Sequence, residues 1–157
     1  NGLQNADSFD GDTVDWKLRS FVDPKARTAT HQVYVDWFFQ GHGTSTYFSS
    51  DDTARPLPTR RILTDSCGRS CGQIDTITIE IDEATLRARV ASGFQIKLRS
   101  TDGGSAILDI TPHMIDAQLQ AEAHVLNGDS AAHTKPGSIV KLEIQRGNDR
   151  LKRDAHM

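Results

Sequence analysis

The stretch His31-Gln32-Val33-Tyr34-Val35-Asp36-Trp37-Phe38-Phe39 decides the fold of this chain. From Val33 to Phe39 every second residue is apolar, and in an extended strand those side chains share one face. The same alternation of apolar with polar or charged residues returns in three later stretches, Thr76–Ile81, Phe94–Arg99 and Val140–Gln145. A strand with one apolar and one polar face is typical of an antiparallel sheet that has one side toward water. The four stretches therefore predict a mainly β protein.

Weaker strand candidates lie between these stretches, at Val14–Val22, Ser45–Ser49, Arg60–Thr64 and Ala106–Thr111. The sequence Asp102-Gly103-Gly104 separates the alternating stretch Phe94–Arg99 from the strand candidate Ala106–Thr111. Glycine readily adopts the positive φ that tight hairpin turns require, so this sequence predicts a β-hairpin.

Two segments have helical character. The first begins at Asp82, which can cap the free amides of a first turn, and ends at Gly93. The second begins at Thr111, places Pro112 at the first helical position and runs to Ala123. Because strands outnumber helices, we expect an antiparallel β-sandwich with two short helical connectors.

Length and charge limit the class of protein. A chain of 157 residues suits one domain that buries its own hydrophobic core. Its 18 Lys and Arg residues against 21 Asp and Glu residues give a net charge of −3, so we predict no nucleic-acid partner. No apolar stretch approaches the roughly 20 residues of a membrane span. We expect a disordered lead-in over residues 1–12, a β-sandwich domain over 13–126, and a loop, final strand and basic tail over 127–157.

Two cysteines, Cys67 and Cys71, flank the sequence Gly68-Arg69-Ser70. A tight reversal there would bring the two thiols within reach of a disulfide. We favour a disulfide that closes a loop between two strands, and such a bond implies a periplasmic or extracellular location. Free thiols, a redox pair and a metal site stay open as alternatives, although a structural zinc site would need further ligands.

Residues that could carry catalysis are few and scattered. His42 lies between Gly41 and Gly43, and Asp36 or Asp51 could orient it toward a hydroxyl nucleophile. Asp51 also belongs to an acidic pair that suits either a turn or a calcium ion. No histidine pair at metal-ligand spacing and no nucleophile-elbow motif is present in the sequence. We therefore predict no catalytic residues, no metal and no cofactor.

Most of the chain resembles an uncharacterised group of bacterial cell-envelope proteins. The resemblance is carried by Trp16–Pro24, Thr30–Val35, the central Cys67 and Cys71, and Leu86–Leu98. This group brings no known activity and no catalytic residues. It implies an N-terminal export or lipoprotein signal, and with it the option of a lipid anchor in the full-length protein.

The end of the chain resembles the closing part of a PDZ domain. Val125–Gly128 matches the family's Asn-Gly turn, and Lys135–Arg146 matches its Pro-Gly turn and last strand. The stretch between them, Asp129–Thr134, is shorter than the helix that forms the peptide groove in that family.

These observations favour a non-enzymatic secreted or periplasmic envelope domain with a binding or structural role. Its expected partner is a protein or peptide of unknown identity. The two alternatives are a PDZ-like peptide-binding module and a hydrolase that uses His42 on a strand-edge loop.

Overall fold

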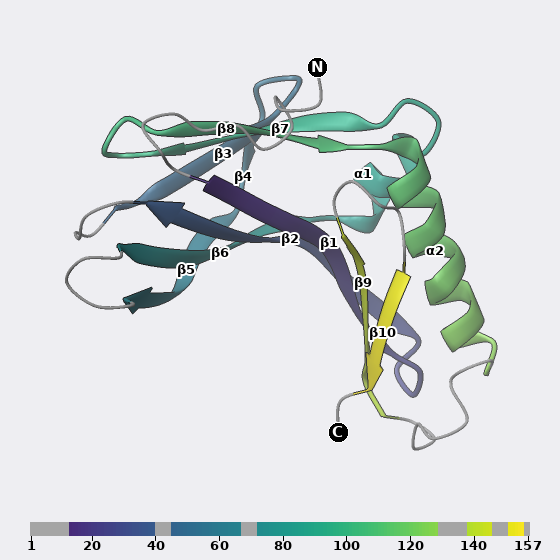
Figure 1. Cartoon of the computed structure of the whole chain (residues 1–157). Coiled ribbons are helices and arrows are strands. Elements are labelled where there is room, and N and C mark those ends of the chain that lie inside the picture. The colour runs from purple at the N-terminus through teal and green to yellow at the C-terminus, as the bar shows by residue number, and fades with distance from the viewer. Residues whose placement is uncertain (1–12, 40–44, 67–71, 129–137, 146–150, 156–157) are drawn as a thin grey trace. The chain divides into compact units, whose positions relative to one another are not determined.

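The protein is mainly β, as the sequence predicts, and the part of the chain that the structure describes has two antiparallel sheets and two helices (Figure 1). The computed structural model describes residues 13–39, 45–66, 72–128, 138–145 and 151–155. Its strands are β1 (Thr13–Asp23), β2 (Thr28–Phe39), β3 (Tyr47–Asp51), β4 (Pro56–Leu57), β5 (Thr59–Ser66), β6 (Gln73–Ile81), β7 (Phe94–Ser100), β8 (Ser105–Ile110), β9 (Val140–Gln145) and β10 (Leu151–Ala155). Its helices are α1 (Glu83–Ala88) and α2 (Pro112–Leu126).

The strands form a six-stranded sheet in the order β10-β9-β1-β2-β6-β5 and a four-stranded sheet in the order β4-β3-β7-β8. By contacts the chain divides into two compact units. The first unit consists of Asn1–Trp16, Val33–Glu80 and Phe94–Ile110. The second unit consists of Lys17–Gln32, Ile81–Gly93 and Thr111–Met157.

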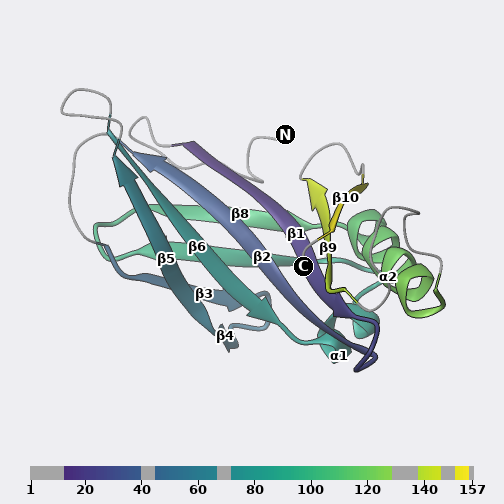
Figure 2. The same ribbon diagram turned by 90° about the horizontal axis from the view of Figure 1, so that it is seen from below.

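In the first unit, the four-stranded sheet lies over the strands β2, β6 and β5, as Figures 1 and 2 show. Trp37 on β2 is in the core between these layers, as the alternation predicts, with 1% of its surface exposed. Its ring centroid lies 5.5 Å from that of Tyr47 on β3. The apolar faces of the two layers therefore pack against each other, as in a β-sandwich.

The predicted hairpin at residues 102–104 is confirmed, because β7 and β8 pair antiparallel across it, with Arg99 opposite Ser105. Gly103 has a φ of +103°, a conformation that favours glycine. Gly104 meets a different demand: a Cβ atom there would lie 2.8 Å from Cζ2 of Trp37. The close approach of the hairpin to the indole ring therefore requires glycine at position 104.

The polar face of β6 differs from the expected water-facing side. Thr76 and Thr78 are each 4% exposed, so the middle of β6 is buried on both faces, whereas Ile74 and Glu80 near its ends are exposed. On the neighbouring β5, Leu63 stands opposite Thr76 and Arg60 stands opposite Thr78. On the opposite edge of β6 from β5 lies β2, where Asp36 accepts a 2.8 Å hydrogen bond from the Thr76 hydroxyl. A strand between two others with long side chains can lose its water contact even where its residues are polar.

In the second unit both helices begin where the sequence predicts. The backbone N–H of Thr85 donates a 2.7 Å hydrogen bond to the Asp82 side chain at the start of α1. The backbone N–H of Met114 donates to the Thr111 hydroxyl at the start of α2. These caps satisfy amide groups that have no partner within the helix. Helix α2 continues to Leu126, three residues beyond the predicted end.

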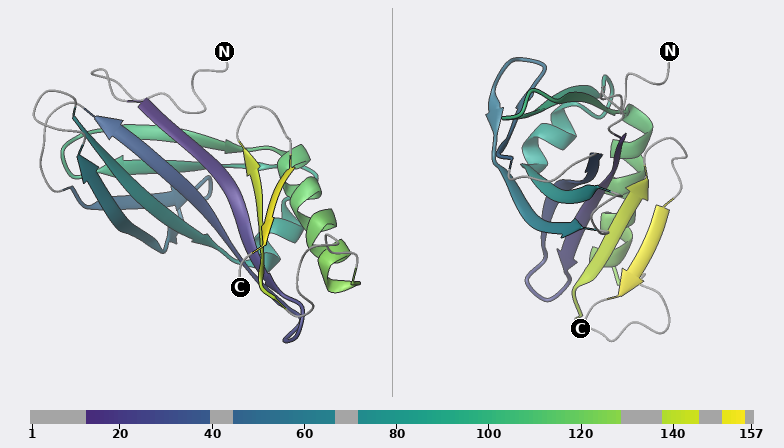
Figure 3. Two further views of the ribbon diagram at one scale, coloured as in Figure 1. Left: turned by 60° about the horizontal axis from the view of Figure 1, so that its bottom comes forward. Right: turned by 60° about the vertical axis from the view of Figure 1, so that its left-hand side comes forward.

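Helix α2 lies along β9, as both views in Figure 3 show. Together with Val22 of β1, the two elements form an apolar cluster, to which they contribute Ala121, Val125, Val140 and Leu142. A buried hydrogen bond also joins the helix to the strand: Nε2 of Gln118 donates to the carbonyl oxygen of Leu142 at 3.2 Å.

One strand of the second unit was not predicted. Residues 151–155 form β10, which pairs antiparallel with β9 and places Leu151 opposite Ile144. The sequence of β10 has no clear apolar alternation, so the pattern that reveals the other strands is absent. In the described part of the chain, neither helix is both long and apolar enough to cross a membrane.

Candidate functional site

Three of the residues singled out from the sequence, His42, Cys67 and Cys71, lie outside the described residues. Asp36 is exposed on β2, where its carboxylate accepts the hydrogen bond from Thr76. The structure therefore gives Asp36 a partner on β6.

Asp51 closes the turn between β3 and β4. Its Oδ1 accepts hydrogen bonds from the backbone N–H and hydroxyl of Thr53 and from the backbone N–H of Arg55, at 2.6–3.0 Å. Its Oδ2 accepts from Nε of Arg55 at 3.1 Å. Burial raises the pKa of Asp51, but these hydrogen bonds outweigh that effect and lower the pKa from 3.8 to about 2. Both oxygens of the Asp51 carboxylate therefore accept hydrogen bonds from residues of the same turn.

A groove of about 620 Å³ opens beside β3, β4 and β7 in the first unit. Its volume is within the range of sites that hold small ligands or short peptide segments. Register explains how its walls form: Phe48 stands opposite Arg99, and Ser50 stands opposite Lys97. These four side chains alternate with the buried residues of the same strands and so lie on the outer face of the sheet.

The groove combines positive charge with an exposed aromatic ring. Phe48 is 52% exposed and lines the groove, so its ring presents apolar surface there. Lys97 and Arg99 are exposed, and neither side chain forms an ion pair or hydrogen bond with another described residue. Leu57 and Pro56 of β4 add further apolar surface. An anionic ligand with an apolar group would match this surface.

The edge of the four-stranded sheet next to the groove, formed by β4, is poorly suited to pairing with another strand. β4 has two residues, Pro56 and Leu57, and Pro58 follows it. Proline has no N–H group to donate to a new strand, so this edge is blocked against extension of the sheet. A ligand in the groove would therefore be held mainly by side chains.

Beneath the groove, a buried carboxylate links the two layers of the first unit. The Tyr47 hydroxyl donates a 2.6 Å hydrogen bond to Oδ2 of Asp75, whose side chain is fully buried. Thr64 and Gln73 donate to Oδ1 of Asp75 at 2.8 and 3.1 Å. Burial, followed by the bond and charge of Asp75, raises the pKa of Tyr47 well above its usual value. Tyr47 is thus held protonated as a donor, and this network is structural.

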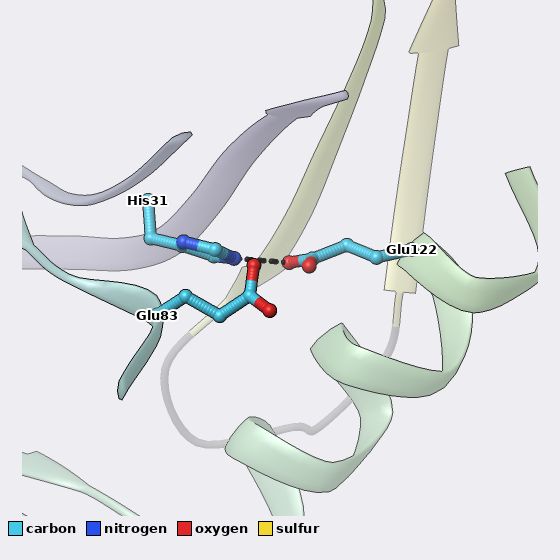
Figure 4. A group of neighbouring side chains, drawn as sticks. All are labelled: His31, Glu83 and Glu122. Carbon is cyan, nitrogen blue, oxygen red and sulfur yellow. Dashed lines mark hydrogen bonds and ion pairs between the residues drawn. The ribbon is translucent and has the colours of Figure 1, made fainter. Parts of the chain in front are cut away.

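The second unit brings together three side chains that are far apart in the sequence (Figure 4). His31 comes from β2, Glu83 from the first turn of α1, and Glu122 from α2. Nε2 of His31 lies 2.7 Å from Oε2 of Glu122, and both side chains are buried. One ligand atom from each of the three residues lies within 4.8 Å of the other two.

A cavity of about 430 Å³ adjoins this cluster and is lined by both glutamates, together with Arg27 and Arg87. Nε of Arg87 contacts Oε2 of Glu83 at 2.8 Å, and Nη1 of Arg27 donates to the carbonyl oxygen of Leu126. The cluster is therefore reachable from the cavity, and imidazole and carboxylate groups are ligands that divalent metals accept.

Sequence reasoning missed both of these places for different reasons. The three residues of the cluster have no common motif, because β2, α1 and α2 each supply one residue. For the groove a signal existed: Lys97 and Arg99 alternate with buried residues, which predicts that both face outward. Their position opposite Phe48 depends on strand register, which the local pattern does not give.

No family model matches the chain, and comparison with curated proteins and with solved structures finds no similar protein.

Proposed function

We propose that this chain is a non-enzymatic binding domain that recognises an acidic peptide segment of a partner protein through the groove of its first unit. The observation that carries the proposal is the exposed Phe48 beside Arg99 and Lys97, two cations without ion-pair partners among the described residues. In a protein with a net charge of −3, such a local concentration of positive charge favours a negatively charged ligand.

Arg99 is the main expected contact to the ligand. Its guanidinium group presents two parallel N–H donors that match a carboxylate, whereas Lys97 offers a point charge. A hydrogen bond between charged groups contributes about 1.5–3 kcal/mol, and the exposure of the groove places this contact at the lower end. Loss of the arginine should therefore weaken binding by about 10- to 30-fold.

The apolar part of the groove favours a ligand that carries apolar side chains as well as negative charge. Phe48 and Leu57 expose apolar surface that an aliphatic or aromatic side chain of the partner could cover. A segment in which acidic residues alternate with large apolar ones would satisfy both the cations and the ring.

We also propose a periplasmic or extracellular location, which rests on the predicted disulfide between Cys67 and Cys71. The PDZ-like alternative depends in part on residues 129–137, and the hydrolase alternative depends on His42. Because those residues lie outside the described part of the chain, both alternatives stay hypotheses.

The experiment is a fluorescence anisotropy titration with a short labelled peptide that alternates glutamate with phenylalanine. The comparison peptide replaces every glutamate with lysine. We expect the protein to bind the acidic peptide and not the basic one, and to bind it more weakly as salt concentration rises.

A charge reversal assigns the binding to the groove. Arg99→Glu should weaken binding of the acidic peptide by at least about 10-fold, because it replaces an attraction with a repulsion. Arg60→Glu is the matched control, since Arg60 is an exposed residue of β5 in the same unit that does not line the groove. Equal binding of the two peptides, or equal losses in the two variants, would refute the proposal.

A further inference from the structure

We propose that His31, Glu83 and Glu122 bind one divalent transition-metal ion of the zinc type. The site lies wholly in the second unit and is independent of the groove and of the function proposed for it. Three protein ligands leave at least one coordination position free, and the adjoining cavity gives that position access to solvent or to a small ligand.

The spacing of the ligand atoms suits such an ion. With metal–ligand distances of about 2.0–2.2 Å, two ligands lie about 3.4 Å apart in tetrahedral geometry and about 3 Å apart in octahedral geometry. The three ligand atoms already lie within 4.8 Å of one another, with His31 and Glu122 at 2.7 Å. Small side-chain rotations would bring Glu83 inward and open the His31–Glu122 contact by less than 1 Å.

The charges at the cluster also favour a cation. Two carboxylates approach one imidazole nitrogen, and Figure 4 shows the Glu83 carboxylate next to the His31–Glu122 contact. Nε2 of His31 can donate a hydrogen bond to one of them, whereas a metal ion can bind the imidazole and both carboxylates together. Arg87 contacts Oε2 of Glu83, which leaves the other oxygen of that carboxylate as a ligand.

The ligand types narrow the choice of metal. Ca²⁺ takes six to eight oxygen ligands, and Mg²⁺ keeps an octahedral shell of oxygens, so an imidazole with two carboxylates suits neither. One nitrogen and two carboxylate ligands suit Zn²⁺ and its spectroscopic substitute Co²⁺. His31 and Glu122 come from β2 and α2, two elements held by the packing of this unit, which favours a preformed site.

The test is a titration of metal-stripped protein with Zn²⁺ by calorimetry, with metal content after gel filtration as a second readout. We expect one ion per chain and a rise in thermal midpoint on zinc addition. Co²⁺ should give the visible absorption of a protein-bound ion with nitrogen and oxygen ligands and no thiolate charge-transfer band.

Glu83→Gln is the decisive variant, because Glu83 is partly exposed and its replacement should leave the fold intact. We expect zinc affinity to fall by at least about 10-fold, the minimum expected when a metal site loses a contact. Asp116→Asn makes the same charge change on the exposed surface of α2 and should leave affinity unchanged. Arg87→Gln removes the Glu83 ion pair but keeps all three ligands, so it should bind zinc as tightly as wild type or more tightly.

Two results would overturn the proposal. One is the absence of stoichiometric zinc binding by the folded wild-type protein. The other is equal affinity in wild type and Glu83→Gln, which would place the ion on other residues, such as Cys67, Cys71 or a histidine outside the described part of the chain.

Discussion

Replacement of Tyr47 by phenylalanine tests whether a buried carboxylate joins the two layers of the first unit. The Tyr47 hydroxyl donates a 2.6 Å hydrogen bond to Oδ2 of Asp75, and the two residues lie on β3 and β6. Phenylalanine keeps the ring that packs against Trp37 at a centroid distance of 5.5 Å. The substitution Tyr47→Phe therefore removes the hydrogen bond and preserves the apolar packing.

The expected loss of stability depends on which partners the Asp75 carboxylate keeps in the Tyr47→Phe variant. In the described part of the chain, Oδ2 would keep only Nη1 of Arg61 at 3.9 Å, while Oδ1 keeps Thr64 and Gln73. A hydrogen bond to a charged group contributes about 1.5–3 kcal/mol, and a buried carboxylate cannot replace the lost donor with water. Tyr47→Phe should lower the free energy of unfolding by this amount, equivalent to about 3–12 °C in the thermal midpoint for a chain of this size.

Urea denaturation followed by tryptophan fluorescence and circular dichroism measures the loss, and a double-mutant cycle with Asp75→Asn assigns it. In the Asp75→Asn background, Tyr47→Phe should cost at least about 1 kcal/mol less, because the charged acceptor is already gone. A loss below about 0.5 kcal/mol, or the same loss in both backgrounds, would show that the hydroxyl does not stabilise the protein through Asp75.

Further predictions concern a close contact, a turn and the cysteines. Gly104→Ala should destabilise the protein by about 1–3 kcal/mol in urea denaturation, because its Cβ would lie 2.8 Å from Trp37; an unchanged midpoint would contradict this packing. Because the pKa of Asp51 is lowered to about 2, its contribution is complete above its ordinary pKa of 3.8 and disappears as pH falls toward 2. The stability difference between wild type and Asp51→Asn should thus be constant above about pH 5 and shrink below pH 4, and a constant difference at all pH values would argue against it. Thiol titration of the denatured, unreduced protein should find no free thiol if Cys67 and Cys71 form the predicted disulfide, and two reactive thiols would refute both that bond and the location it implies.

The fold could be predicted because its main signal is local. Alternation in β2, β6, β7 and β9 depends only on the two-residue period of a strand, and the helix starts at Asp82 and Thr111 depend only on capping side chains. The hairpin at residues 102–104 is equally local. Strand β10 lacks such a pattern and forms by pairing with β9, so the sequence alone did not reveal it.

The candidate sites depend on contacts between distant segments. The outward direction of Lys97 and Arg99 follows from alternation, but their meeting with Phe48 depends on the register between β3 and β7. The cluster of His31, Glu83 and Glu122 has no local signal at all, because a strand and two helices each supply a single side chain. Periodicity along the chain determines which face of an element is buried. Only the packing of the elements determines which side chains of different elements come into contact. A binding site consists of such contacts, so it depends on the tertiary structure.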